Sequence, residues 1–457
     1  MSAVTEAMAG VVGAANITSG AAVSDDYSHD ECLTTPGRAP VAVVRPGTTD
    51  EVAGIVSVAL EHGAPLTARG SGTGLSGACV PVEGGVVVSF ERMDAILDID
   101  ERNHVAVVQP GVRLETLDHA LAPHGLVYPV FPGEQSASLG GNVATNAGGM
   151  RAVRHGVTRH HILGLEAVLG SGEVIRTGGR FVKATAGYDL TQLIVGSEGT
   201  LALVCEATLR LQPRPDHSVT LLAPFATLEQ VATAVPPVVA SGLAPLMVEY
   251  IDLLTMGAIT ANAGIELGIP HAVRDTALAY LVVVLDNHRD DRLAEDAEAL
   301  AVLLDGLGAL DVYVLPAVTG GQLIEARERA FWSAKAAGAD DIIDVVVPRA
   351  SIPEYLARVG ELAAGSASLV VGCGHAGDGN VHLSVFQPDT EVRHHLVGDI
   401  ITTGVGFGGA VSGEHGIGRE KKGYFLATED PVKLELMHRI KSAFDPAGLL
   451  NPGVIFD

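Results

Sequence analysis

Two histidines flank a short glycine-rich turn in the C-terminal half of the chain. In Gly374–His382, β-prone runs on either side and turn formers between them predict a tight hairpin. If Ala376 pairs with Val381, His375 lies opposite His382, with Cβ atoms about 4.5 to 5.5 Å apart. Two imidazoles at that separation can bind one divalent metal ion. Taken alone, the pair fits a purely structural contact between two rings equally well.

A metal site needs a third ligand, and a second glycine-flanked segment offers one. Ser412–Gly418 places the carboxylate of Glu414 beside the imidazole of His415. Because no apolar periodicity brackets this segment, we predict a loop rather than a helix. Taken alone, it is more typical of an exposed turn than of a metal site.

Composition limits the class of protein. The chain has 457 residues, 47% of them hydrophobic, which predicts two or more domains with ample core. A net charge of −25 disfavours nucleic acid and anionic membrane surfaces as partners. The longest apolar run, Leu278–Leu285, is too short to be a transmembrane segment. The scattered cysteines lack C-x-x-C spacing and follow no secretory signal, so we predict a cytoplasmic protein with reduced thiols at Cys32, Cys79, Cys205 and Cys373.

The N-terminal half contains two glycine-rich segments that follow predicted elements. A strand over 40–46, a helix over 52–62 capped by Thr48 or Thr49, and a strand over 64–69 lead into Gly70–Gly77. A turn and a strand follow these glycines, so they are no Rossmann fingerprint, and backbone N–H groups would have to hold an anionic ligand. The second segment, Pro132–Gly149, is rich in Gly, Ser, Thr and Asn. We expect it to bury no apolar face and to contact a polar ligand.

From residue 219 onwards, strands alternate with helices rich in Ala and Leu. This pattern predicts an α+β domain in which helices cover an antiparallel sheet. The expected strands are 219–223, 246–252 and 278–285, the expected helices are 227–241, 291–304 and 326–337, and 344–348 is a buried strand end.

Four motifs together resemble a known family. They are Arg69–Gly77, Gly140–Gly149, Gly187–Leu190 and Gly196–Thr200, in this order. The chain resembles the FAD-linked 2-hydroxyacid dehydrogenases of the vanillyl-alcohol-oxidase superfamily, which include D-lactate dehydrogenases, D-2-hydroxyglutarate dehydrogenases and the FAD subunit of glycolate oxidase. The resemblance implies an α+β fold with an N-terminal segment at 1–35, a two-subdomain FAD-binding domain of the PCMH type at 36–215, and a substrate- and metal-binding domain with an antiparallel sheet at 216–457. The C-terminal tail would return to the flavin.

The resemblance also implies which residues surround FAD. No histidine lies between Arg69 and Pro81, where some relatives attach FAD covalently, so we expect non-covalent FAD and a packed thiol at Cys79. The implied FAD residues are Arg69, Gly70, Ser71, Gly72, Thr73, Gly74, Leu75 and Ser76 around the pyrophosphate, and Ser136, Gly140, Gly141, Thr145, Asn146, Gly149, Gly156, Glu198, Gly199 and Asn451 around the rest.

The family's metal ligands map onto His375, His382 and Glu414, and its base maps onto His415. Zinc is the metal we expect, with manganese and iron as alternatives. In this chemistry the metal lowers the pKa of the substrate hydroxyl, the base takes its proton, and hydride passes from Cα to flavin N5. A carboxylate at the place of Glu249 lies near the active site in relatives.

One departure from the family concerns the substrate. Relatives usually carry Trp-x-x-Arg where this chain has Trp332 and Lys335, and a lysine cannot make the two-pronged contact of an arginine. A lysine of the dicarboxylate-acting relatives is also replaced, by Ile342 or Ile343. We therefore expect a D-2-hydroxyacid that is smaller or more apolar than 2-hydroxyglutarate, with Lys335 and Arg349 as candidate anion partners.

The electron acceptor stays open at this point, with a flavoprotein, a quinone or a dye-like carrier as the expected kinds. Two other functions also stay open. The protein could be a flavin oxidase that uses oxygen, or an electron-transfer FAD subunit of a larger complex like glycolate oxidase. A homodimer is the assembly we expect.

Overall fold

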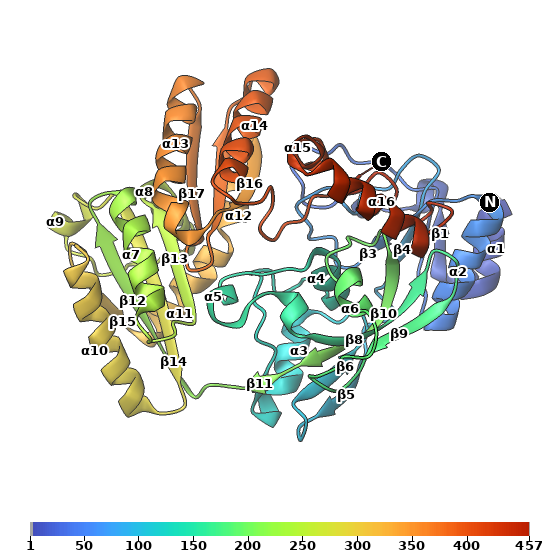
Figure 1. Ribbon diagram of the computed structural model, residues 1–457, viewed down its shortest axis with the longest axis horizontal. Helices are drawn as coiled ribbons and strands as arrows, with labels where there is room; N and C mark the ends of the chain where they lie inside the picture. Colours follow the sequence, from blue (N-terminus) through green and yellow to red (C-terminus); the bar gives the residue numbers. More distant parts are fainter. Residues whose placement is uncertain (1–2, 457) are drawn as a thin grey trace.

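A computed structural model describes residues 3–456 of the chain (Figure 1). Its N-terminal part begins with helix α1 (Ala3–Val12), which packs on α2 (Thr49–His62). Thr48 caps α2 by accepting the N–H of Glu51, which confirms the predicted cap. Beside these helices lies a four-stranded sheet with β2, β4 and β3 mutually parallel, in the order β1 (Ile17–Ser19), β2 (Ala42–Val44), β4 (Val86–Ser89), β3 (Leu66–Arg69).

A second, antiparallel sheet forms the next layer of this part of the molecule. Its order is β5 (Ile96–Asp100), β6 (Val105–Val108), β10 (Ala202–Arg210), β8 (Ile162–Leu169), β9 (Val174–Gly178). Apolar residues of α3 (Leu114–Leu121) and α6 (Leu190–Ile194) share one core with it. The two sheets correspond to the two predicted α/β subdomains, each with its own hydrophobic cluster.

The glycine-rich stretch at 132–149 differs from the sequence-based expectation. It contains a helix, α4 (Leu139–Thr145), that buries the side chains of Leu139 and Val143. These two residues are four apart and therefore lie on the same side of a helix. Ser138 caps the start of α4 by accepting the N–H of Gly141, and Asn146, with φ 54°, ends it in the left-handed conformation. The expectation that this stretch buries no apolar face was wrong because one well-spaced apolar pair is sufficient.

The C-terminal part contains a seven-stranded sheet in which every neighbouring pair is antiparallel, as predicted. Its order is β15 (Tyr313–Leu315), β12 (His217–Phe225), β14 (Ala279–Asn287), β13 (Met247–Asp252), β17 (Leu369–His375), β18 (Asn380–Phe386), β16 (Asp341–Val346). One face packs on α7 (Leu228–Ala240), α10 (Asp290–Gly306), α13 (Ile352–Gly365) and α14 (Thr390–Gly406). The other face packs on α8 (Leu253–Ala263), α11 (Ala317–Glu328) and the start of α12 (Ala330–Ala336).

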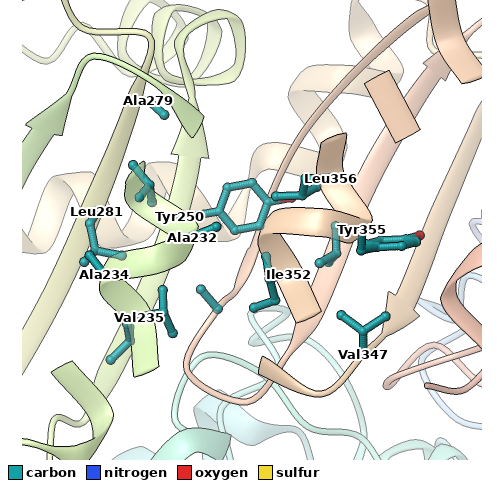
Figure 2. Packing of buried hydrophobic residues seen from close by; sticks show 14 of the residues in the cluster. Ala232, Ala234, Val235, Tyr250, Ala279, Leu281, Val347, Ile352, Tyr355 and Leu356 are labelled. Atoms are coloured by element: carbon teal, nitrogen blue, oxygen red, sulfur yellow. The ribbon is translucent and has the colours of Figure 1, made fainter. Parts of the chain in front are cut away.

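The largest hydrophobic cluster lies on the first of these faces. Figure 2 shows Tyr250 of β13 beside Ile352 and Leu356 of α13, with Ala232 of α7 close by. Because side chains alternate along a strand, the residue before Tyr250 points to the opposite face. That residue is Glu249, a carboxylate with no exposed surface. The strand that carries the core tyrosine therefore also places a buried charge on the far face.

The C-terminal segment returns to the N-terminal part of the molecule. Helices α15 (Lys422–Thr428) and α16 (Pro431–Phe444) lie on that side in Figure 1, and both chain ends are found there. After α16, Leu450 forms a parallel bridge with Leu66 of the edge strand β3, and the Asn451 N–H donates to the Leu66 carbonyl at 2.7 Å. Of the helices described, none is long and apolar enough to cross a membrane.

Candidate active site

The two histidines of the hairpin lie on the same face of strands β17 and β18. The register places His375 opposite Asn380 and His382 opposite Cys373, so the predicted direct pairing of the histidines is wrong. The reason is that the four-residue connection is 376–379, one residue earlier in the chain than the predicted 377–380. The rings are diagonal neighbours, with centroids 4.8 Å apart and planes at 80°. Diagonal neighbours on one face are still within reach of long side chains.

Glu414 completes a group of three metal-type ligands. Its Oε1 lies 3.1 Å from His375 Nε2 and 3.2 Å from His382 Nε2. One ligand atom from each of the three residues lies within 4.8 Å of the others. Two imidazoles and one carboxylate suit a divalent transition metal and leave coordination positions open for substrate. The donor set therefore fits the predicted metal site.

Burial and the neighbouring carboxylates shift the pKa of His375 in opposite directions. Burial lowers its pKa, but the carboxylates of Glu249 and Glu414 outweigh burial and raise it to about 10. Burial likewise raises the pKa of Glu414, yet His375 and His382 hold it well below its usual range. The group is thus a compact cluster of compensating charges.

A second pair of charged residues supports His375 from behind. The ring donates from Nδ1 to Glu249 Oε1 at 2.8 Å, and Arg327 lies 2.9 Å from the other carboxylate oxygen. The Glu249 side chain is fully buried, and that of Arg327 is 7% exposed. This contact fixes the ring so that Nε2 faces Glu414. Sequence reasoning missed Arg327, although an arginine four residues after the buried Leu323 of α11 breaks the apolar face of that helix.

Asp344 of β16 holds the loop that carries Glu414 and His415. Its Oδ2 accepts the backbone N–H groups of both residues at 2.8 Å, and Lys421 Nζ donates to its Oδ1. Burial raises the pKa of Asp344, but His415 and Lys421 outweigh it and hold the pKa below the usual range. Sequence reasoning treated this residue only as part of a strand end. A carboxylate directly before three successive valines, Val345–Val347, was the available signal.

His415 lies between the metal-type ligands and this anchor. Its ring stacks on that of His382, with centroids 5.2 Å apart, and its Nδ1 is 3.7 Å from Asp344 Oδ1. Burial lowers the pKa of His415 to about 4. The imidazole is therefore neutral near pH 7, which is the form that can accept a proton.

Two cavities meet at this loop. The first, of about 210 Å³, is lined by residues 69–76, the start of α4, residues 197–199 and Asn451. The second, of about 510 Å³, is lined by all three metal-type ligands and by α8 and α12. Glu414 and His415 line both cavities. A ligand in the first cavity would therefore lie next to the metal-type ligands.

The first cavity has features expected of a site for a large polar cofactor. Three buried polar atoms on its wall, Ser76 Oγ, Asn142 Nδ2 and Asn451 Oδ1, have no hydrogen-bond partner within residues 3–456. Buried polar groups are rarely left unpaired, so a bound ligand is the natural source of their partners. Gly70 passes so close to α4 that a Cβ there would collide with Ser138 Oγ. The residues present therefore fit a dinucleotide such as FAD.

Most of the predicted FAD residues line this cavity. They are Arg69, Gly70, Ser71, Gly72, Thr73, Gly74, Leu75, Ser76, Gly140, Gly141, Thr145, Glu198, Gly199 and Asn451. Ser136, Asn146, Gly149 and Gly156 lie outside its lining; the Ser136 carbonyl accepts from Ser71 Oγ at 2.6 Å, and the two glycines adopt positive φ. The Glu198 carboxylate faces the active-site loop, where it accepts the N–H groups of Ile417 and Gly418 at 2.8 Å each.

Comparison with known proteins identifies the family. Residues 214–455 match the family described as FAD linked oxidases, C-terminal domain, and residues 40–178 match the FAD binding domain. The chain belongs to the FAD-linked oxidase family. This FAD-linked oxidase is 57% identical over 456 residues to an uncharacterized FAD-linked oxidoreductase of Mycobacterium tuberculosis H37Rv, covering 100% of this chain and 99% of the relative.

More distant relatives agree with this assignment. The FAD-linked oxidase is 37% identical over 439 residues to a D-lactate dehydrogenase of Archaeoglobus fulgidus, covering 94% of this chain and 96% of that one. A solved structure of p-cresol methylhydroxylase with substrate bound has the same fold, with a TM-score of 0.82 and 18% identity over 99% of this chain and 96% of that chain. The predicted family and fold class are both confirmed.

The two predicted anion partners, Lys335 and Arg349, lie outside the lining of the second cavity. Lys335 Nζ is 2.6 Å from the carboxylate of Glu31 and lies 5.2 Å from the centre of the Trp332 ring. Arg349 is exposed on the turn after β16. Neither side chain lines the second cavity of this FAD-linked oxidase, although Trp332 does.

Proposed function

We propose that this FAD-linked oxidase oxidises a D-2-hydroxyacid to the 2-oxoacid, with FAD as the hydride acceptor and one divalent metal, zinc first, in the site. The observation that carries the proposal is that Glu414 and His415 line both cavities. A base and a metal-type ligand thus lie between the proposed FAD space and the proposed substrate space. The similarity to a D-lactate dehydrogenase supports this substrate class.

His375, His382 and Glu414 would hold the metal, which when bound supplies a Lewis acid that lowers the pKa of the substrate hydroxyl. Glu249 keeps the His375 ring turned toward this position through its contact at Nδ1. His415 would take the hydroxyl proton. Because its Nδ1 faces Asp344, Nε2 is the nitrogen left for that proton.

Residues of the first cavity would bind FAD without a covalent bond. The backbone of Gly70–Ser76 would surround the pyrophosphate, since successive N–H groups in glycine-rich turns bind phosphate well. Asn142 and Ser76 offer unpaired polar atoms on the same wall. These contacts would orient the flavin toward His415.

The test is the variant His415→Gln, with His271→Gln on the exposed helix α9 (His271–Arg274) as its control. We expect His415→Gln to retain FAD and metal but to bleach the flavin about 10²- to 10⁴-fold more slowly with D-2-hydroxyacids under anaerobic conditions. The control should bleach at the wild-type rate. An undiminished rate for a metal- and FAD-loaded His415→Gln protein would contradict the proposed base. Hydrogen peroxide formed per turnover separates oxygen from other electron acceptors.

A further inference from the structure

The second cavity extends away from the metal-type ligands along one face of β17 and β18. The successive pairs on this face are Cys373–His382, Val371–Ser384 and Leu369–Phe386, and all six residues line the cavity. A strand rises about 3.3 Å per residue, so the last pair lies about 13 Å beyond the first. The cavity therefore reaches far beyond the space that a one- or two-carbon substituent needs.

The walls of this extension are largely apolar. Leu254 and Ala258 of α8 and Phe331 and Ala334 of α12 line the cavity together with the strand residues. Ile342, which lies opposite Ser384 in the register, adds a further branched side chain. A concave site with such walls takes an apolar group.

Several large apolar side chains of this cavity are left open to solvent. Leu254 is 57% exposed, Leu369 is 48% exposed and Trp332 is 40% exposed. Apolar side chains gathered around one cavity indicate a surface that an apolar ligand covers. Because Leu369 ends the strand row that starts at the metal-type ligands, and Leu254 and Trp332 line the same cavity, a substrate held there would cover them with its side chain.

Charge in the cavity disfavours a second carboxylate on the substrate. Of the described residues that line it, Arg327 is the one arginine or lysine, and Glu249 already pairs with it. The carboxyl groups of Glu31, Glu134 and Glu328 line the same cavity, and Lys335 is already paired with Glu31. A distal carboxylate would meet further carboxyl groups and, among the described residues that line the cavity, no cation without a carboxylate partner.

We propose that the preferred substrate is a 2-hydroxy monocarboxylate with a large apolar side chain, of about four or more carbon atoms, and that Val371, Ile342 and Phe386 receive this side chain. The proposal rests on the proposed function and names its substrate class. The metal-type ligands and His415 act on the 2-hydroxyacid end, and the apolar extension accounts for the rest of the cavity.

Anaerobic reduction of the FAD- and metal-loaded protein by a panel of acids tests the proposal. The panel is glycolate, D-lactate, D-2-hydroxyisocaproate, D-3-phenyllactate and D-2-hydroxyglutarate. L-lactate and L-2-hydroxyisocaproate are included to test stereospecificity. We expect kcat/KM for D-2-hydroxyisocaproate to exceed that for D-lactate on the order of 10- to 100-fold. A highest value for glycolate, D-lactate or D-2-hydroxyglutarate would overturn this inference alone. Bleaching by none of the acids would overturn it together with the proposed function.

Binding supplies a readout that does not depend on turnover. Trp332 is the single tryptophan of the chain and lines the cavity, so its fluorescence reports a ligand there. We expect 4-methyl-2-oxopentanoate to bind with a Kd at least about 10-fold lower than that of 2-oxoglutarate. Equal or tighter binding of 2-oxoglutarate would contradict the proposal.

Variants of cavity residues test where the side chain of the substrate binds. Val371→Phe should fill the cavity and lower the kcat/KM ratio of D-2-hydroxyisocaproate over D-lactate about 10-fold or more. Val302→Phe, the same change at a position of α10 that is 69% exposed, should leave that ratio at the wild-type value. Leu369→Lys, at a half-exposed position that tolerates a charge, should lower the same ratio even if Val371→Phe folds poorly. An unchanged ratio in Leu369→Lys and in folded Val371→Phe protein would overturn the inference.

Discussion

His375 is the residue on which both charge and geometry of the candidate site depend. One ring nitrogen contacts Glu249 and the other faces Glu414, so the ring has a single usable orientation. Glu249 in turn pairs with Arg327, and both are buried. The Glu249 carboxylate therefore compensates the positive charge of both Arg327 and His375. Its loss would leave a buried guanidinium without its partner.

Glu249→Gln should therefore weaken metal binding while leaving FAD in place. Loss of the group that orients a ligand histidine typically lowers metal affinity about 10- to 100-fold. Chelator competition with zinc measures the affinity, and flavin absorbance measures FAD content. Glu229→Gln, an exposed position of α7, is the matched control and should bind zinc as the wild type does. Wild-type zinc affinity in Glu249→Gln would contradict the role assigned to the carboxylate.

Strand β16 is the element that links stability to the active-site loop. It carries two buried aspartates, Asp341 and Asp344, whose pKa values shift in opposite directions. Asp344 faces Lys421 and three backbone N–H groups of the loop, whereas Asp341 is buried near Glu420. The same strand therefore holds one stabilising carboxylate and one that opposes folding at neutral pH.

Asp344→Asn should destabilise the protein by about 3 to 5 kcal/mol, because it leaves the buried Lys421 ammonium without its counter-ion. The free energy of unfolding from urea denaturation checks this value. Substrate-dependent bleaching should fall as well, since Glu414 and His415 lose the acceptor of their N–H groups. A free energy of unfolding within about 0.5 kcal/mol of the wild type would contradict the anchor.

Asp341→Asn is the matched variant on the same strand, and we expect it to raise the free energy of unfolding, whereas Asp344→Asn lowers it. Burial, aided by Glu420, raises the pKa of Asp341 to about 7, above the value of about 3.9 in an unfolded chain. Between these values the folded state binds more protons, so stability falls as pH rises through this window. The variant removes that loss and should raise the free energy of unfolding on the order of 1 to 3 kcal/mol at pH 8. Urea denaturation at pH 8 and pH 5 should show a smaller gain at pH 5; equal gains would contradict the cause.

At the scale of the whole molecule, the C-terminal segment joins the N-terminal part to the active-site loop. The Asn451 side chain donates to the carbonyls of Ala78 and Glu198, at 3.1 and 2.8 Å. The Glu198 carboxylate in turn holds the loop residues Ile417 and Gly418. One residue near the end of the chain thus supports both the first cavity and the loop beside it.

Asn451→Ala should lower FAD affinity on the order of 10-fold or more, because two buried carbonyls lose their donor. The Kd of FAD for the apoprotein measures this effect. Asn103→Ala, at an exposed turn, should bind FAD with the wild-type Kd. An unchanged Kd of FAD in Asn451→Ala would contradict a role of the C-terminal segment in cofactor binding.

The sequence predicted the features that depend on residue type and local spacing. The antiparallel sheet, the cap at Thr48 and the loop around Glu414 follow from periodicity and turn residues. The three proposed ligands could be predicted because histidines and a glutamate beside glycine-rich turns are recognisable without a fold. The structure brings their ligand atoms together.

Other features depend on pairings that single-sequence patterns do not contain. The hairpin register was missed because the position of the turn, unlike its composition, is set by contacts such as the bond from the Asn380 N–H to Asp378. Asp344 and Arg327 were missed because their partners come from distant segments. Helix α4 was missed because its glycine content hid an apolar pair that only the neighbouring sheet makes useful.

The bridge between Leu66 and Leu450 has a consequence for biosynthesis. Strand β3 is an edge of the first sheet, and its open side is covered by a segment that the ribosome makes roughly 380 residues later. At roughly 5 to 20 residues per second, that edge stays uncovered for about 20 to 80 s in the nascent chain. Chaperones that shield exposed strand edges would have their substrate in this interval, and stable cofactor loading would follow the arrival of Asn451.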